Sequence, residues 1–188
     1  MDTPPIGLRT DRKEKINMSI TQDFSAYFES VSLMGSDKKK IPSGTYGVDI
    51  IEFNCIKSKS GNNAVKWKAV IDEVKNIKAE ADPDKFENDA TKLLGRAFSA
   101  TDNIEISSKN EFIAGRWTLI ASEWLGKEAV QKIYEDNKGN ELNDYVYDLA
   151  LAIQKASSKK KIFKAVVERE IDGEYFKSRI LPPLPEAK

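Results

Sequence analysis

Apolar and polar residues alternate along two neighbouring stretches of the chain, Tyr46–Cys55 and Ala64–Ile71. A two-residue repeat is typical of a β-strand, because successive side chains of a strand point to opposite faces of its sheet. In the first stretch, one side of the repeat holds Tyr46, Val48 and Ile50, and the other holds Ile51, Phe53 and Cys55. In the second stretch, apolar residues alternate with Lys66 and Lys68. The polar segment Lys57–Asn62 separates the two, so the pattern predicts a β-hairpin whose second strand has one core face and one positively charged face.

Three more strands are predicted further along the chain. A polar connector, Val74–Lys92, precedes a third strand over Leu93–Ala100. Alternating residues over Ile162–Glu170 and Tyr175–Leu181 then predict a second hairpin. The dipeptide Asp172-Gly173 between them is a strong two-residue turn signal, because such turns need positive φ at their central positions.

The segment between the third and fourth predicted strands has a helical pattern instead. Ser108 and Glu111 have the spacing of a capping box, which marks the start of a helix. Apolar side chains then recur three or four residues apart, at Ile113, Trp117, Ile120 and Trp124. Gly126 is expected to end this helix. A short helix over Lys127–Tyr134 and a longer one with Leu142, Val146, Leu149 and Ile153 on one side complete the segment.

Five strands with helices between the third and the fourth are the outline of an OB-fold, a small, partly open β-barrel. We therefore expect a mainly β, OB-fold-like domain over residues 41–181, with a helical insertion at about 108–158. Residues 1–40 are expected to form a flexible, charged tail followed by a short packing helix around Phe24 and Phe28. Residues 182–188 are expected to be a C-terminal tail.

The amino-acid composition excludes several kinds of functional site. The chain of 188 residues has 30 Lys and Arg against 30 Asp and Glu, no histidine, and Cys55 as its only cysteine. Zinc sites need several Cys or His ligands and Ser-His catalysis needs a histidine, so we expect no metal and no cofactor. No apolar run approaches the ~20 residues that span a bilayer, and no signal-peptide core precedes the domain, so we expect a cytoplasmic location and no membrane partner. Because positive and negative charges balance, any binding of nucleic acid must use a local cluster of cations.

Four short segments occur in order along the chain: Asp23–Tyr27, Ile41–Tyr46 with the Lys57–Asn62 turn, Gly95–Phe98, and Val166–Glu170 with Asp172–Tyr175. Together they resemble a family of small bacteriophage proteins encoded in replication and recombination modules. The resemblance implies an OB-like fold and binding of single-stranded DNA without sequence preference, in the host-cell cytoplasm, alongside phage replication or recombination proteins. The chain departs from this family in its N-terminal extension, in the large insertion between Ala121 and Ser158, and in lacking an acidic C-terminal tail.

Sequence-tolerant binding of single strands needs cations that follow the phosphates and aromatic rings on which bases stack. The predicted strands and turns offer both, at Lys57, Lys59, Lys66, Lys68, Arg96, Phe98, Lys164, Arg169, Tyr175, Lys177 and Arg179. In an OB-fold, the second and third strands and their flanking loops form the binding face. Lys66, Lys68 and Arg96 are therefore the first candidates.

These candidates have structural alternatives. Lysines that alternate with apolar residues on a strand commonly form a solvated face. Trp67 has the phase of the core, and Trp117 and Trp124 lie on the apolar side of a helix, so we expect all three to pack inside. For Phe98, the pattern leaves two alternatives open: packing in the core or stacking on a base. Tyr175 shares the phase of two cations and is expected to be exposed.

The sequence gives less support to other classes of function. The phosphate-binding patterns G-x-x-x-x-G-K-[ST] and G-x-G-x-x-G are both absent. Asp49, Glu52, Asp72 and Glu73 could ligate the magnesium of a nuclease, but no motif gathers them, so we expect a protein that is not an enzyme. An alternative that stays open is a protein-interaction module, in which the helical insertion docks onto a polymerase, helicase or recombinase, or forms a homo-oligomer. An apolar patch on the insertion would favour this alternative.

Overall fold

A computed structural model of the chain describes residues 39–78, 84–107, 112–172 and 175–183. Several sequence predictions lie outside these residues: the N-terminal tail and packing helix, including the Asp23–Tyr27 segment, the capping box at 108–111, and the turn at 173–174. The described part of the chain is mainly β, and none of its helices is both long and apolar enough to cross a membrane.

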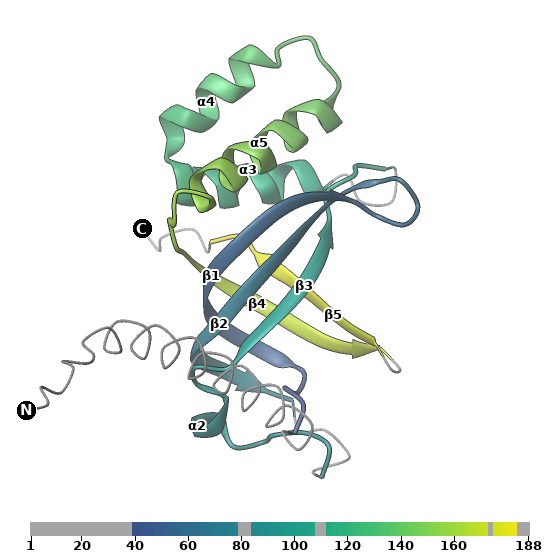
Figure 1. The fold of residues 1–188 in the computed structure, drawn as a ribbon. Coiled ribbons are helices and arrows are strands. Elements are labelled where there is room, and N and C mark those ends of the chain that lie inside the picture. The colour runs from purple at the N-terminus through teal and green to yellow at the C-terminus, as the bar shows by residue number, and fades with distance from the viewer. Residues whose placement is uncertain (1–38, 79–83, 108–111, 173–174, 184–188) are drawn as a thin grey trace, which may run out of the picture. The chain divides into compact units, whose positions relative to one another are not determined.

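The described strands form one antiparallel sheet of five strands (Figure 1), in the order β3-β2-β1-β4-β5. The strands are β1 (Gly44–Lys57), β2 (Asn63–Ile77), β3 (Ala97–Asn103), β4 (Phe163–Asp172) and β5 (Tyr175–Leu181). The two predicted hairpins are β1–β2 and β4–β5, and β1 joins them by pairing with β4. The two edge strands, β3 and β5, lie against each other, but no strand pairing joins them within the described residues.

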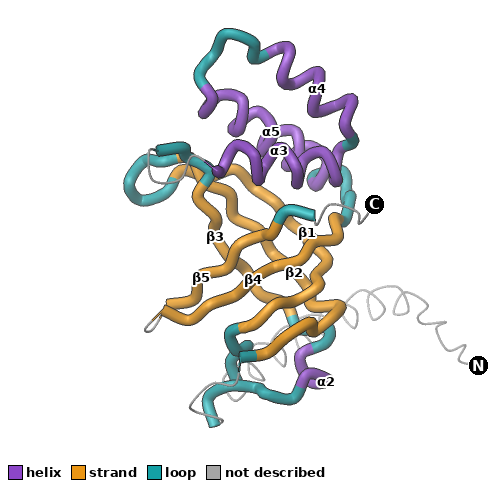
Figure 2. The backbone as a smooth tube through the Cα atoms, turned by 180° about the vertical axis from the view of Figure 1, so that it is seen from behind, coloured by secondary structure: helices purple, strands orange, loops and turns teal. Residues whose placement is uncertain are grey.

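Four described helices complete the fold: α2 (Ala90–Leu93), α3 (Phe112–Leu125), α4 (Lys127–Asp136) and α5 (Leu142–Ser157). The last three follow β3 and precede β4 along the chain. Figures 1 and 2 show, from opposite sides, that these three helices gather at one end of the sheet and that α2 lies at the other. Helix α3 ends before Gly126, whose φ of 92° favours glycine, as the sequence predicted.

The apolar side of α3 packs on aromatic residues of the sheet. The ring of Phe53 on β1 makes edge contacts with Trp117 and Trp124, at centroid distances of 5.9 and 6.1 Å. Trp124 also stacks on Phe163 of β4 at 4.8 Å. Trp67 of β2 is buried beneath the same sheet, so the prediction that all three tryptophans belong to the core is confirmed.

The alternation along β1 was wrong in one respect. Tyr46, Val48 and Ile50 are buried, but so is Phe53, which the repeat had assigned to the other side. The register with β2 shifts between Ile50 and Glu52, which marks a bulge or similar irregularity, and such an extra residue reverses the phase of everything after it. Phe53 therefore faces the core on the same side of β1 as Tyr46, Val48 and Ile50.

The boundaries of three elements also differ from the predictions. Strand β2 continues to Ile77, into the segment predicted to be a connector. Strand β3 begins at Ala97 instead of Leu93, because residues 90–93 form α2, which begins after Asp89. The Asp89 side chain accepts a hydrogen bond from the backbone N–H of Thr91, a typical N-cap. Helix α4 runs on to Asp136.

Candidate nucleic-acid interface

The outer face of β2, which points away from the core, carries the two lysines that the sequence put first. Lys66 is exposed and lies opposite Asn54 of β1 and Thr101 of β3, which are both neutral. Lys68 lies opposite Glu52 and forms an ion pair with it at 3.5 Å. The neighbouring lysines of β2 thus differ, because one has a carboxylate partner and the other has none among the described residues.

The end of β1 and the loop that joins it to β2 add two exposed lysines, Lys57 and Lys59. Gly61, at a φ of 84°, lets the loop turn, and the hydroxyl of Ser58 accepts a hydrogen bond from the backbone N–H of Asn62. Lys57 donates a hydrogen bond of 2.6 Å to the neutral side chain of Asn63. Lys57, Lys59 and Lys66, here called the hairpin lysines, form no ion pair with any residue in the described ranges.

Two cations on the other strands, Lys164 and Arg179, are held by acids. Lys164 of β4 bridges two neighbouring strands, at 3.2 Å from Asp49 and 2.9 Å from Asp72. Hydrogen bonds to Asp72 and Asp49, followed by their charges, raise the pKa of Lys164. Arg179 of β5 donates two hydrogen bonds to Glu168, at 2.8 and 2.5 Å. These two candidate residues are therefore engaged with carboxylates and are less available to phosphate.

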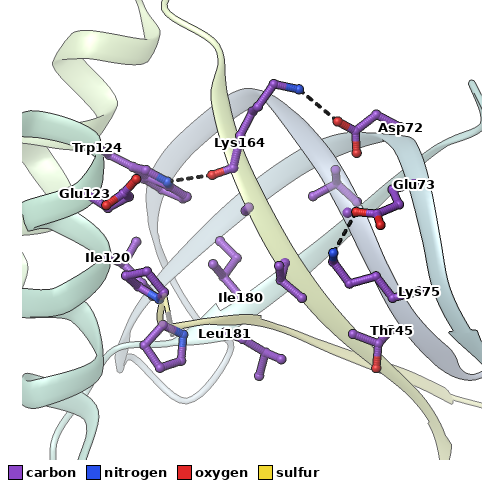
Figure 3. A pocket seen from close by; sticks show the side chains of 16 residues that line it. Thr45, Asp72, Glu73, Lys75, Ile120, Glu123, Trp124, Lys164, Ile180 and Leu181 are labelled. Atoms are coloured by element: carbon purple, nitrogen blue, oxygen red, sulfur yellow. Dashed lines mark hydrogen bonds and ion pairs between the residues drawn. The ribbon is translucent and has the colours of Figure 1, made fainter. Parts of the chain in front are cut away.

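A groove of about 730 Å³ lies between α3 and this ion-paired part of the sheet. Figure 3 shows Ile120 and Trp124 on its helix side, and Lys164 pointing toward Asp72 on the other side. The N–H of the Trp124 indole donates to the backbone oxygen of Lys164, which ties the helix to β4. Because the lysines of this groove face acids, its charge does not favour a polyanion.

Arg96 and Phe98 do not join the hairpin lysines. Arg96 precedes β3, is half-buried, and has a pKa lowered chiefly by burial, although the charge of Glu87 opposes this. Phe98 is only 9% exposed and its ring contacts Trp67 at 5.7 Å. Of its two alternatives, the core is therefore the one observed.

Arg169 points into the core side of the sheet, where the sequence had counted it as a surface cation. It is 7% exposed, and its guanidinium lies over Phe98 and Phe176, at 5.2 and 3.9 Å from the ring centroids. Burial lowers the pKa of Arg169 to about 10; the charge of Tyr46 opposes this shift, and that of Arg96 acts in the same direction as burial. The phase of β4 was a usable signal, because Arg169 shares it with the apolar residues Phe163 and Val167.

The outer face of β5 carries the remaining candidates. Tyr175 is 77% exposed, as predicted, and Lys177 is exposed on the same side. The structure thus divides the candidates into the hairpin lysines with Lys68, the outer residues of β5, the acid-held Lys164, and an interior group around Arg169. The sequence interpretation did not include three residues near Arg169. The half-buried rings of Phe86 and Phe176 contact each other, and the exposed Lys40 lies over Phe176, as Arg169 does.

The acidic residues considered for a magnesium site do not form one cluster. Among the described residues, no three Asp, Glu, Cys or His side chains are arranged so that they could hold a metal ion. Lys164 lies between Asp49 and Asp72 and occupies the position that a cation would need.

Comparison of the chain with models of protein families, with curated proteins and with solved structures gives no match in any of the three. The functional assignment therefore depends on the geometry and charge of the chain itself.

Proposed function

We propose that this chain is a non-enzymatic protein that binds single-stranded DNA without sequence preference, in the cytoplasm of a phage-infected host, as part of DNA replication or recombination. The phosphates would lie along the outer face of β2 and β3 and the β1–β2 loop. The observation that carries the proposal is the distribution of paired and unpaired cations over the sheet.

That distribution is uneven. The hairpin lysines have no carboxylate partner among the described residues. Lys66 lies between the neutral Asn54 and Thr101, and Lys57 is bonded to the neutral Asn63, whose backbone N–H donates to Glu105. In contrast, Lys68, Lys75, Lys78, Lys164 and Arg179 each have one or more carboxylates within 4 Å. Cations without an acid partner suit a phosphate backbone, because no carboxylate bound to them has to be displaced.

The proposed fold behind this face is an OB-fold-like, partly open barrel. In its support, the edge strands β3 and β5 run in the same direction and touch. A hydrogen bond from the backbone N–H of Ile180 on β5 lowers the pKa of Asp102 on β3. The guanidinium of Arg169 contacts Phe98 of β3 and Phe176 of β5. These contacts connect the two edge strands, which no strand pairing joins within the described residues. In this fold, the face of the second and third strands and the loop after the first strand bind oligonucleotides.

Electrostatics would supply most of the affinity. The rings of Trp67 and Phe98 lie on the buried side of β2 and β3, so they are not available to stack on bases. Tyr175 on β5 is the exposed ring among the predicted contact residues. If the hairpin lysines neutralise three phosphates, the logarithm of the binding constant should fall with the logarithm of salt concentration with a slope of about −2.

The first test is a fluorescence-anisotropy titration of a labelled oligo-dT of about 16 nucleotides, a length within reach of one OB-fold. A duplex of equal length and two salt concentrations, about 50 and about 200 mM, serve as comparisons. We expect binding of the single strand that weakens roughly fifteenfold between these salts, and weaker binding of the duplex. Absence of binding by folded protein at the lower salt would refute the proposal.

A protein-interaction role is a second candidate, favoured by one observation. The described residues expose eight large hydrophobic side chains, and five of them, Phe112, Leu119, Tyr134, Leu142 and Leu151, lie on α3, α4 and α5. Exposed apolar residues concentrated on one part of a molecule indicate a contact surface. Light scattering of the purified protein tests the simplest form, a homo-oligomer: assembly that is lost in Phe112→Ser with Leu119→Ser would support it, and a monomer at every concentration would exclude it.

A further inference from the structure

Arg169 is a nearly buried cation at the gap between the two edge strands. Phe98 approaches its guanidinium from β3 and Phe176 approaches it from β5. Because no strand pairing joins β3 to β5 in the described part of the chain, the guanidinium lies where the sheet is open. Its 7% exposure shows that only a small part of the side chain reaches the surface there.

The hydrogen bonds of Arg169 go to neutral acceptors and do not compensate its positive charge. Nε donates to the backbone oxygen of Ile41 at 3.4 Å, and Nη1 donates to the hydroxyl of Ser178 at 3.2 Å. Both acceptors are neutral, and none of the described residues accepts a hydrogen bond from Nη2. No carboxylate in the described ranges lies within ion-pair distance. Buried charges are ordinarily paired, so a buried guanidinium without an acid indicates a site for an anion that comes from outside.

Other cations lie near Arg169. The charge of Arg96 lowers the pKa of Arg169 further, although the charge of Tyr46 opposes this, and Arg96 itself feels the charge of Glu87. The ammonium of Lys40 lies 5.8 Å from the centroid of Phe176, the same ring that Arg169 covers. Two cations over one ring, with a third whose charge reaches Arg169, favour a ligand with more than one negative charge.

We propose that Arg169, flanked by Arg96 and Lys40, binds a phosphate monoester at the gap between β3 and β5. A monoester carries its charge on three terminal oxygens and has a single substituent, so it can enter a narrow site end-on. A phosphate inside a strand has substituents on two sides and would have to continue along the gap, where the buried carboxylate of Asp102 would repel its neighbours.

Two sources of a phosphate monoester are considered. One is the phosphorylated end of a bound DNA strand, and this form of the inference rests on the proposed function. The other is a free nucleotide. The two share the same terminal group, and the experiment below separates them.

The test compares the affinity of oligo-dT that carries a 5′-phosphate, a 3′-phosphate or only hydroxyl ends, by competition in fluorescence anisotropy. We expect one phosphorylated end to improve binding about tenfold, the order of a charged hydrogen bond. Arg169→Gln, which keeps much of the shape and removes the charge, should abolish this preference. Lys66→Gln should weaken all three oligonucleotides by the same factor, because it lies on the outer face.

Thermal unfolding of the wild-type protein with dTMP or with thymidine is the second arm, and it needs no variant that might misfold. A rise in Tm with dTMP and none with thymidine supports the site. If dTMP acts while the oligonucleotides bind regardless of their ends, the source is a free nucleotide. If dTMP acts while no oligonucleotide binds, the proposed function fails and the site stands. Equal binding of the three oligonucleotides together with no effect of dTMP overturns the inference and leaves Arg169 a structural residue held by its two rings.

Discussion

The carboxylate of Asp102 on β3 lies 2.8 Å from a guanidinium nitrogen of Arg116 on α3, and each of the two side chains is 10% exposed. This ion pair joins an edge of the sheet to the first helix that follows it. The pair is not fully satisfied, because Oδ2 of Asp102 and Nε of Arg116 have no hydrogen-bond partner among the residues that the structure describes. Burial raises the pKa of Asp102, and the charge of Arg116 only partly opposes it.

The raised pKa fixes the direction of a pH effect. The folded protein binds the Asp102 proton more tightly than the unfolded chain, whose aspartates titrate near about 3.9. The contribution of Asp102 to the free energy of unfolding is therefore greatest below that pH and falls as pH rises through the folded pKa. We predict that the free energy of unfolding of the wild type, minus that of Asp102→Asn, decreases from about pH 4 upward and then becomes constant. Urea unfolding followed by tryptophan fluorescence measures this difference.

Asp136→Asn is the matched control, because it makes the same chemical change at an exposed position at the end of α4. Its difference from the wild type should lack the decrease seen for Asp102→Asn. A difference for Asp102→Asn that increases with pH would contradict the prediction and would mean that Arg116 outweighs burial.

The strand pairs and the aromatic core were readable from the sequence, because they depend on local alternation and on helical spacing. The two hairpins, the buried tryptophans and the end of α3 at Gly126 are of this kind. The irregularity between Ile50 and Glu52 was not readable, since it depends on the register of β1 against β2, a property of two segments together. The start of β3 was missed for a related reason: α2 is a four-residue helix, too short to show a repeat.

The sequence predicted which residues could contact DNA, but not which of them lie together or have acid partners. Alternation along β2 correctly placed Lys66 and Lys68 on the outer face, yet only the register with β1 shows that Glu52 pairs with one of them. Arg169 was misassigned because a cation on a strand was taken to be exposed, although its phase matched that of Val167. Which cations are free depends on neighbours far away in the chain, and a single sequence does not contain that information in readable form.

Lys66 and Lys75 offer a matched pair on one strand. Both are exposed lysines of β2, but Lys75 is bonded to Glu73 at 2.6 Å and Lys66 has no acid partner in the described residues. We predict that Lys66→Gln reduces the steepness of the salt dependence of oligo-dT binding by about 0.7, the value for one phosphate contact on a single strand. Lys75→Gln should leave the slope unchanged. Equal effects of the two substitutions would show that net charge matters and that position does not.

Cys55 should be a poorly reactive thiol. It is half-buried on β1, and burial raises its pKa to about 11. Because the thiolate is the nucleophile, its fraction at pH 8 is lower than in an unfolded chain by roughly two orders of magnitude. Iodoacetamide should therefore modify the native protein about that much more slowly than protein unfolded in urea, as followed by mass spectrometry. Similar rates in the two states would mean that the thiol is accessible and ionised in the folded protein.

Two glycines should respond in opposite directions to the same substitution. A Cβ on Gly44 would collide with the backbone oxygen of Asn76 on the paired strand, and backbone cannot move aside as a flexible side chain can. Gly115 lies on the exposed side of α3, where a Cβ would meet nothing within 4 Å. We predict that Gly44→Ala lowers the free energy of unfolding by about 1–3 kcal/mol, the usual cost of overpacking. Gly115→Ala should raise it by about 0.5–1 kcal/mol, because alanine restricts the unfolded chain and favours the helix. Urea unfolding monitored by circular dichroism measures both changes, and a stabilising Gly44→Ala would mean that β1 and β2 are not as close there as the register requires.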